Sequence, residues 1–356
     1  MNRVLVGTER GLLLMAETSD GWSLRRTMLP DFEVSSVVRS GNGRSLYVAT
    51  RQAGVFNVDP DTGQAEAIGA GSLPAGVRCI SVAPTDPNML YVGCEPAALY
   101  RSRDGGRTWQ ECVAVTALAR ERNWRYHIDR IPAHIRHILI DRRSPERIYA
   151  AVQIGGLIYS DDGGQSWTDV VDSIDADVHV LAQHPQQADV LFAATGGGGP
   201  IGGPHPPVPP NGYGLYRSQD AGRSWVPMSA GMERQHSVPL HLPEGQNLIL
   251  SALARGVPTN WRRAAGADAV FVASRDGGHT WTQGGEGLPE SFPLMIDSID
   301  SEPKLGGRTY IGVGGEGTKV LPAELHRGWV YYANEVAGPW QKLPYDFPTV
   351  FTVTVV

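Results

Sequence analysis

The sequence predicts an all-β fold built from repeated sheets, and three observations support this prediction. Gly and Pro together supply 69 of the 356 residues, whereas charged residues make up only 19%, a composition typical of turn-rich β proteins rather than of disordered or coiled-coil chains. One short motif recurs at a nearly constant spacing. The chain also ends, at residues 349–356, in a β-branched strand with no neighbouring strand in the sequence to pair with.

The two ends of the chain predict one sheet between them. Residues 4–14 and 22–27 have the pattern of three strands, and the lone C-terminal strand would complete them as a fourth, innermost strand. Such a closure removes the open edges of a ring of sheets. Residues 34–40, 45–50 and 54–58 predict the next sheet, whose turn at residues 59–63 lacks the recurring motif.

The recurring motif has the form Ser-x-Asp-x-Gly-x-x-Trp and is present in four copies. Its tryptophans and that of a decayed fifth copy at residues 333–340 lie 56 to 59 positions apart: Trp109, Trp167, Trp225, Trp281 and Trp340. In each copy Asp can accept backbone N–H bonds in a tight turn, Gly allows positive φ, and Trp fills the space beneath a hairpin. This spacing suits one four-stranded propeller blade with its loops.

Two further strand signals precede each copy, separated by a turn. They lie at residues 77–82 and 89–93, 135–140 and 147–152, 178–183 and 190–195, and 237–242 and 247–252. Counting the first and last segments as one blade, we predict an all-β protein of about seven blades, a β-propeller formed by residues 1–356 as a single domain.

The motif resembles the Asp-box, or BNR repeat, of sialidases, sortilin-type receptors, some glycoside hydrolases and the photosystem II assembly factor family. In those families the box joins the two outer strands of a blade on the face opposite the functional one. The resemblance therefore implies structural roles for Asp104, Asp162, Asp220 and Asp276. It does not extend to a true sialidase, because Arg130-Ile-Pro132 follows the first box rather than preceding it.

Composition excludes several partners. A formal charge of -6 argues against nucleic acid, and no apolar run approaches the roughly 18 residues of a membrane span. Glu9 and Arg10 interrupt the N-terminal apolar stretch, so we expect no secretory signal. Three cysteines in apolar segments indicate reduced thiols, and a cytoplasmic protein is expected.

In a propeller, ligands usually lie on the face where the innermost strands begin. Aligning these strands places four polar residues at one register, and the adjoining loops add others; the full set is Arg78, Arg136, His179, His236, Arg51, Glu95, Gln153, Arg255, Glu316, Tyr126, His127, Asp129, Arg130 and His134. We expect a mouth lined mainly by blades three to six. The Gly- and Pro-rich segment 195–212 is either a loop over this mouth, carrying His205 inward, or a tolerated insertion.

These residue types predict three kinds of role. Arginine side chains can bind a carboxylate or phosphate through two hydrogen bonds. We therefore predict a substrate-binding set of Arg51, Arg78, Arg136, Gln153, Arg255, Tyr126 and His205. The alternative is that the arginines form structural bridges between blades. As a catalytic set we expect His179 or His236 paired with an acid, namely Glu95, Asp129 or Glu316. A divalent metal, held by His127, His134, His179 and His236, is a further hypothesis, although no sequence motif supports it.

Two function classes follow. The first is an enzyme of hydrolase or lyase type that acts on a small anionic or sugar-like molecule, with or without a metal. The second is a non-catalytic assembly or protein-interaction scaffold, as the resemblance to the photosystem II assembly factor family implies. Fold alone does not decide between them, since propellers host many tasks.

Overall fold

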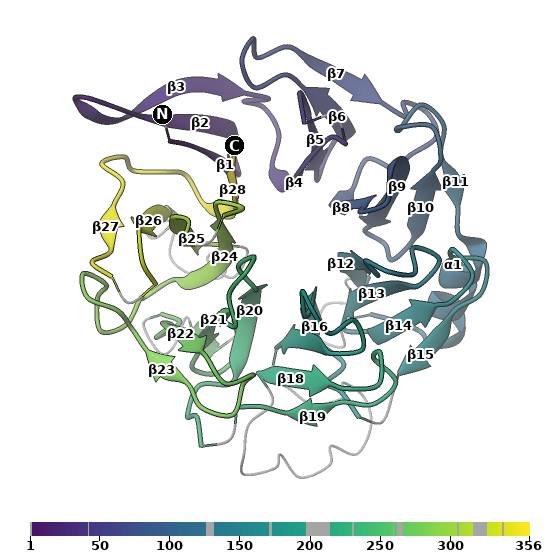
Figure 1. Ribbon diagram of the computed structural model, residues 1–356. Helices are drawn as coiled ribbons and strands as arrows, with labels where there is room; N and C mark the ends of the chain where they lie inside the picture. Colours follow the sequence, from purple (N-terminus) through teal and green to yellow (C-terminus); the bar gives the residue numbers. More distant parts are fainter. Residues whose placement is uncertain are drawn as a thin grey trace.

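A computed structural model describes the whole chain except residues 1, 42, 126–131, 171–172, 197–213, 230, 259, 262–265, 305, 316–325 and 337. Seven four-stranded antiparallel sheets stand as blades around a central channel (Figure 1). The innermost strands of successive blades contact one another all the way around the ring. The predicted seven-bladed β-propeller is therefore confirmed.

The first four blades follow, each from its innermost strand outward. Blade 1 contains β28 (Val350–Val355), β1 (Arg3–Thr8), β2 (Gly11–Thr18) and β3 (Gly21–Met28). Blade 2 contains β4 (Val34–Arg39), β5 (Leu46–Thr50), β6 (Gly54–Val58) and β7 (Ala65–Ile68). Blade 3 contains β8 (Val77–Ala83), β9 (Asp86–Cys94), β10 (Leu99–Ser102) and β11 (Gln110–Glu111). Blade 4 contains β12 (His134–Ile140), β13 (Ile148–Gln153), β14 (Gly156–Ser160) and β15 (Thr168–Val170).

The remaining blades have the same order. Blade 5 contains β16 (Val178–Gln183), β17 (Leu191–Thr195), β18 (Leu215–Ser218) and β19 (Val226–Pro227). Blade 6 contains β20 (His236–His241), β21 (Ile249–Ala254), β22 (Val270–Ser274) and β23 (Thr282–Gln283). Blade 7 contains β24 (Met295–Ser301), β25 (Thr309–Gly314), β26 (Trp329–Ala333) and β27 (Gln341–Lys342). A short helix, α1 (Val113–Glu121), follows blade 3, and no helix in the described part of the chain is long and apolar enough to cross a membrane.

The C-terminal strand closes the ring as predicted. β28 pairs antiparallel with β1, with Val6 opposite Val353. Side chains of blade 7 also hold β28, since the backbone N–H of Val353 donates to Ser298 Oγ over 3.0 Å and that of Val355 donates to Asp300 Oδ2 over 2.9 Å. The first and last parts of the chain thus become one blade.

The recurring motif folds into the structural turn that the resemblance implies. In blade 4, Asp162 Oδ1 accepts hydrogen bonds from Ser160 Oγ (2.8 Å) and the Ser166 backbone N–H (2.9 Å), while Gly163 and Gly164 have φ of 71° and 88°. These bonds to the carboxylate, the Ser166 hydroxyl foremost, lower the pKa of Asp162 to about 2. The box is therefore a turn stabilised by an ionised aspartate.

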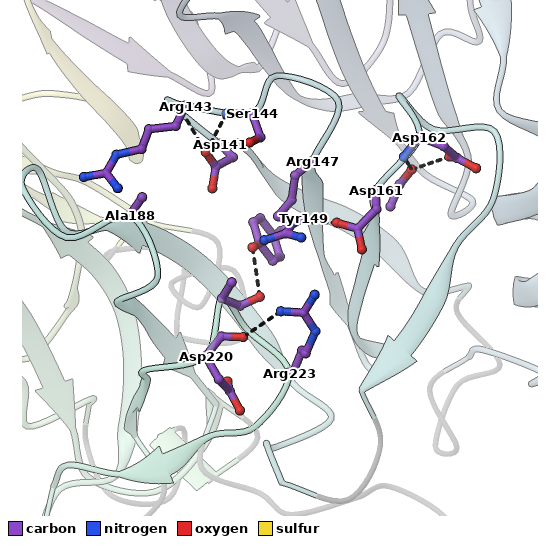
Figure 2. Close-up of polar contacts among 12 residues, drawn as sticks. Asp141, Arg143, Ser144, Arg147, Tyr149, Asp161, Asp162, Ala188, Asp220 and Arg223 are labelled. Atoms are coloured by element: carbon purple, nitrogen blue, oxygen red, sulfur yellow. Dashed lines mark hydrogen bonds and ion pairs between the residues drawn. The ribbon is translucent and has the colours of Figure 1, made fainter.

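Three of the four boxes also accept a hydrogen bond from a tyrosine of the preceding blade. The Tyr149 hydroxyl of blade 4 donates to the Ala221 carbonyl oxygen in the blade 5 box over 2.9 Å (Figure 2). Tyr91 donates to Gly163 and Tyr47 to Gly105 in the same way, over 3.4 and 3.3 Å. Together with apolar clusters shared between neighbouring blades, these bonds fix the angle between blades on the face opposite the mouth.

Candidate functional site

A cavity of about 360 Å³ occupies the channel where the innermost strands begin. It takes lining residues from all seven innermost strands, which is a wider set than the predicted blades three to six. Arg51, Arg78, Arg136, Asp297 and Phe351 are among them. The channel mouth is thus a shared product of the whole ring.

A β-bulge interrupts every innermost strand at the same register. We call the extra residues the bulge ring: Ser35, Arg78, Arg136, His179, the pair Val238 and Pro239, Asp297 and Phe351. A bulge bends a strand locally and re-aims its side chain. The bulges therefore explain why these side chains differ from the alternating apolar pattern of the strands and gather at the mouth.

The observed strand register agrees with the predicted positions of three residues and differs for one. Arg78, Arg136 and His179 occupy equivalent positions as predicted. His236 does not, because the bulge of β20 falls after Ser237. His236 is equivalent instead to His134 and Asp177, and these three residues, together with Glu33 on blade 2, form what we call the rim, two residues before the bulge ring.

Each arginine of the mouth has a carboxylate partner. Arg78 Nη1 lies 3.1 Å from Glu95 Oε2, and its Nη2 donates to His134 Nε2 over 2.9 Å. Arg51 lies 3.7 Å from the Glu33 carboxylate. The guanidinium of Arg51 also covers the Phe351 ring, 4.4 Å from its centroid.

Arg136 contacts residues of two different blades. Its Nη1 donates to Gln153 Oε1 over 3.2 Å, and its Nη2 lies 3.7 Å from Asp297 Oδ2, which belongs to blade 7 rather than to a neighbouring blade. The Asp297 carboxylate is only 6% exposed. Since β12 and β24 stand on opposite sides of the central opening (Figure 1), this pair crosses the channel.

His179 is buried and holds Asp177. Its Nδ1 lies 2.6 Å from the Ser237 carbonyl oxygen and its Nε2 lies 3.1 Å from Asp177 Oδ1. Both ring nitrogens thus face acceptors, and the side chain is 0% exposed. Burial alone would raise the pKa of the Asp177 carboxyl, but His179 and Arg136 hold it below its usual value.

His236 packs beside this pair as a neutral ring. Its Nδ1 donates to the Gly196 carbonyl oxygen over 3.0 Å, and its ring lies edge-on to His179 and to Trp261. Burial lowers the pKa of His236 to about 3, and the neighbouring His179 acts in the same direction. Neither His179 nor His236 presents an accessible proton to the cavity.

A metal site gains no support from this geometry. Within the ranges that the structure describes, no group of three or more His, Cys, Asp or Glu side chains is placed to hold a metal ion. His134 Nε2 accepts from Arg78, and both nitrogens of His179 are engaged by acceptors. Metal binding stays a prediction for which the described residues offer no ligand set.

Other predicted residues lie elsewhere. Arg255 is half exposed and pairs with Glu233 and Asp268, both at 2.9 Å, outside the cavity lining. Six predicted residues lie outside the described residues, and their roles stay predictions: Tyr126, His127, Asp129, Arg130, His205 and Glu316.

Four residues of the mouth were missed by the sequence reasoning: Glu33, Asp177, Asp297 and Phe351. Asp297 and Phe351 are the bulge residues of β24 and β28, equivalent to Arg78 and Arg136. Asp177 is the equivalent of His134. Aligning all seven innermost strands, rather than four, would have found them.

Comparisons with known proteins agree with this architecture. A family model for the BNR/Asp-box repeat matches residues 100–111 and 158–169. A xyloglucanase from Paenibacillus sp is 24% identical over 292 residues, which is 80% of this chain and 24% of that protein. The chain thus spans about a quarter of the length of this relative.

Solved structures establish the fold. The Niastella koreensis GH74 enzyme has a TM-score of 0.62 and 14% identity, over 87% of this chain and 45% of that one. The structure of YCF48 bound to D1 peptide has a TM-score of 0.55 and 17% identity, over 89% of this chain and 86% of that one. With its closing strand and seven sheets, the chain is a seven-bladed β-propeller that carries BNR/Asp-box repeats.

Proposed function

We propose that the channel mouth binds a neutral, hydroxyl-rich ligand of the carbohydrate class and that the protein hydrolyses a glycosidic bond there. One observation carries this proposal: each of the three arginines that the structure describes at the mouth, Arg51, Arg78 and Arg136, is already paired with a carboxylate. The mouth therefore offers many hydrogen-bond donors and acceptors with little net charge.

The balance of charges disfavours the anionic ligand that the sequence also predicted. Three arginines, Arg51, Arg78 and Arg136, face four acids: Glu33, Glu95, Asp177 and Asp297. An incoming carboxylate or phosphate would have to displace one of these acids from its guanidinium. A sugar hydroxyl, in contrast, can donate to a carboxylate and accept from a guanidinium without breaking the pair.

Hydrolysis of a glycosidic bond commonly requires two carboxyl groups, one ionised and one that donates a proton. We assign the ionised role to Asp177, which His179 and Arg136 keep charged. We assign the proton donor to Glu95, whose side chain is 30% exposed, against 13% for Asp177 and 6% for Asp297. Since Arg78 lies 3.1 Å away and favours the ionised form of Glu95, the bound sugar must first separate this ion pair so that Glu95 can carry a proton. Both assigned carboxylates lie at the mouth, above the cavity.

The relative named xyloglucanase supports the same class of substrate. Its length is about four times the part that this chain matches, so the substrate of this chain is a proposal and xyloglucan is the first probe to use. Xyloglucan oligosaccharides and aryl glycosides of their constituent sugars cover both the natural linkage and an activated leaving group.

The test compares the wild type with Glu95→Gln and Asp177→Asn. We expect each variant to lose at least 100-fold in kcat/KM, as removal of a catalytic carboxyl does, while calorimetric binding of oligosaccharide changes by less than about threefold. Arg143→Gln, an exposed change in the turn after β12, at the end of this strand that lies away from the mouth, is the matched control and should keep full activity. A wild type that neither binds nor cleaves any of these sugars would overturn the proposal.

A second candidate is a binding protein without turnover. The observation that favours it is length, since the chain covers 86% of the YCF48 chain solved with a peptide but only 45% of the GH74 enzyme. Sugar assays that are negative, combined with a peptide that binds the mouth and loses affinity in Arg78→Gln, would favour this candidate over the hydrolase.

A further inference from the structure

We infer that the site recognises the end of a carbohydrate chain rather than its middle, and that Arg136 and Asp297 form a crossbar that the terminal sugar meets. The inference rests on the proposed function and specifies which part of the sugar chain binds. Its evidence is independent of catalysis, because it concerns the shape of the cavity and one ion pair within it.

The cavity lies along the ring axis, and we call it a pit because the Arg136–Asp297 ion pair crosses the channel there. All seven innermost strands contribute to its lining, so it has walls on every side. A polymer bound through an internal residue needs a site that is open at two ends, because the chain continues in both directions. At about 360 Å³ the pit is also near the lower limit of small-molecule pockets, roughly 300 to 1,000 Å³.

The crossbar limits how deep a sugar can go. Arg136 projects from blade 4 and Asp297 from blade 7, and their charged groups meet at 3.7 Å across the channel. The other terminal nitrogen of the guanidinium, Arg136 Nη1, donates to Gln153 Oε1 over 3.2 Å, which holds the side chain in place. Gly315 makes room for the carboxylate, since a Cβ atom at that position would collide with Asp297.

The crossbar has the chemistry of a diol receptor. A guanidinium N–H and a carboxylate oxygen lie side by side, so one hydroxyl can accept from Arg136 while its neighbour donates to Asp297. The predicted ligand therefore bears two neighbouring unsubstituted hydroxyls at this position. Internal sugars can also carry such a diol, so it is the cavity wall, closed on every side, that selects a chain end.

Saturation-transfer NMR of the wild-type protein with xyloglucan oligosaccharides tests this without requiring turnover. We expect the strongest saturation on protons of one terminal residue, and an affinity that does not rise with chain length beyond about two residues. Blocking the hydroxyls of that terminal residue by methylation should reduce affinity at least tenfold. Saturation spread over internal residues, or an affinity that rises steadily with length, would overturn the inference while leaving the proposed function standing.

Variants locate the contact. Arg136→Gln and Asp297→Asn should each weaken binding at least tenfold, whereas the control Arg143→Gln should not change it. Arg136→Lys keeps the positive charge but loses the planar pair of N–H donors, and it provides a second test if the Gln variant fails to fold. Unchanged binding in folded Arg136→Lys and Asp297→Asn would refute the crossbar, and failure of the wild type to bind any sugar would refute the proposed function itself.

Discussion

His179 Nδ1 donates to the Ser237 carbonyl oxygen across the boundary between blades 5 and 6, over 2.6 Å. The same relationship recurs around the channel, where Ser35 Oγ donates to Val77 O over 2.8 Å and Ser81 Oγ donates to Ile138 O over 2.7 Å. Every innermost strand has a free edge facing the channel, and such edges carry unpaired backbone groups. Polar side chains of the neighbouring blade satisfy them, so part of the polarity of the channel is structural.

Replacing His179 by Ala should therefore lower stability. The Ser237 carbonyl and the Asp177 carboxylate would both lose a buried donor, which costs about 2 to 4 kcal/mol of unfolding free energy. Urea unfolding followed by tryptophan fluorescence measures the loss. His279→Ala is the matched control because His279 is exposed, and it should change stability by less than about 0.5 kcal/mol. Equal stability of the two variants would contradict the edge-capping role.

The fold was predictable because its signals are local and repeated. Each box combines a turn, in which an aspartate is followed by two residues of positive φ, with a tryptophan that fills the hairpin, and four copies reveal the period. The closing strand was predictable because a β-branched C-terminus without a partner matches a blade that lacks one strand.

The site was only partly predictable because it depends on register between distant strands. Arg78 and Arg136 stood out as charges in apolar strands, whereas Asp297 was not expected as the partner of Arg136. His236 was assigned to the wrong register since the bulge in β20 contains two residues, Val238 and Pro239, in place of one. A bulge is not visible in a strand pattern until the pairing partner is known.

Removal of the Tyr149 hydroxyl should loosen the contact between blades 4 and 5. Tyr149→Phe leaves the ring in place but deprives the Ala221 carbonyl of its donor (Figure 2). We expect a loss of about 1 kcal/mol in unfolding free energy, the usual value for one hydrogen bond, with sugar binding unchanged. Tyr159→Phe makes the same chemical change on the half-buried neighbouring ring and should cost less. A larger loss in Tyr159→Phe than in Tyr149→Phe would refute this account.

Two partly desolvated histidines of the channel, His137 and His236, should make the protein sensitive to acid. Burial lowers the pKa of His137 to about 4 and that of His236 to about 3, whereas unfolded histidine titrates near 6.5. Between these values the unfolded chain binds more protons, so stability falls as pH decreases from about 6.5 to about 4. Each histidine contributes up to about 1.4 kcal/mol per pH unit.

Urea unfolding of the wild type and His137→Gln at pH 7, 6 and 5 checks this sign. The unfolding free energy of the variant should depend less steeply on pH than that of the wild type, and the difference should correspond to at most one bound proton. Asp300 acts in the opposite sense, because burial raises the pKa of its carboxyl and its contribution is lost as pH rises. The difference between the two proteins isolates the histidine, and identical slopes would show that His137 is as accessible to protons in the folded state as in the unfolded state.

Deleting residues 350–356 should open the ring. The deletion removes the partner of β1 and exposes Val4 and Val6, which are fully buried beside β28. It also removes the backbone N–H groups that donate hydrogen bonds to Ser298 and Asp300. We expect the truncated chain to lose its single cooperative unfolding transition and its affinity for sugar, since Phe351 and the wall formed by β28 are part of the cavity. A synthetic peptide of residues 349–356 added in trans should restore both properties, whereas a scrambled peptide of the same composition should not. A truncated chain that unfolds cooperatively at the wild-type urea concentration would mean that the ring is held closed by contacts other than this strand.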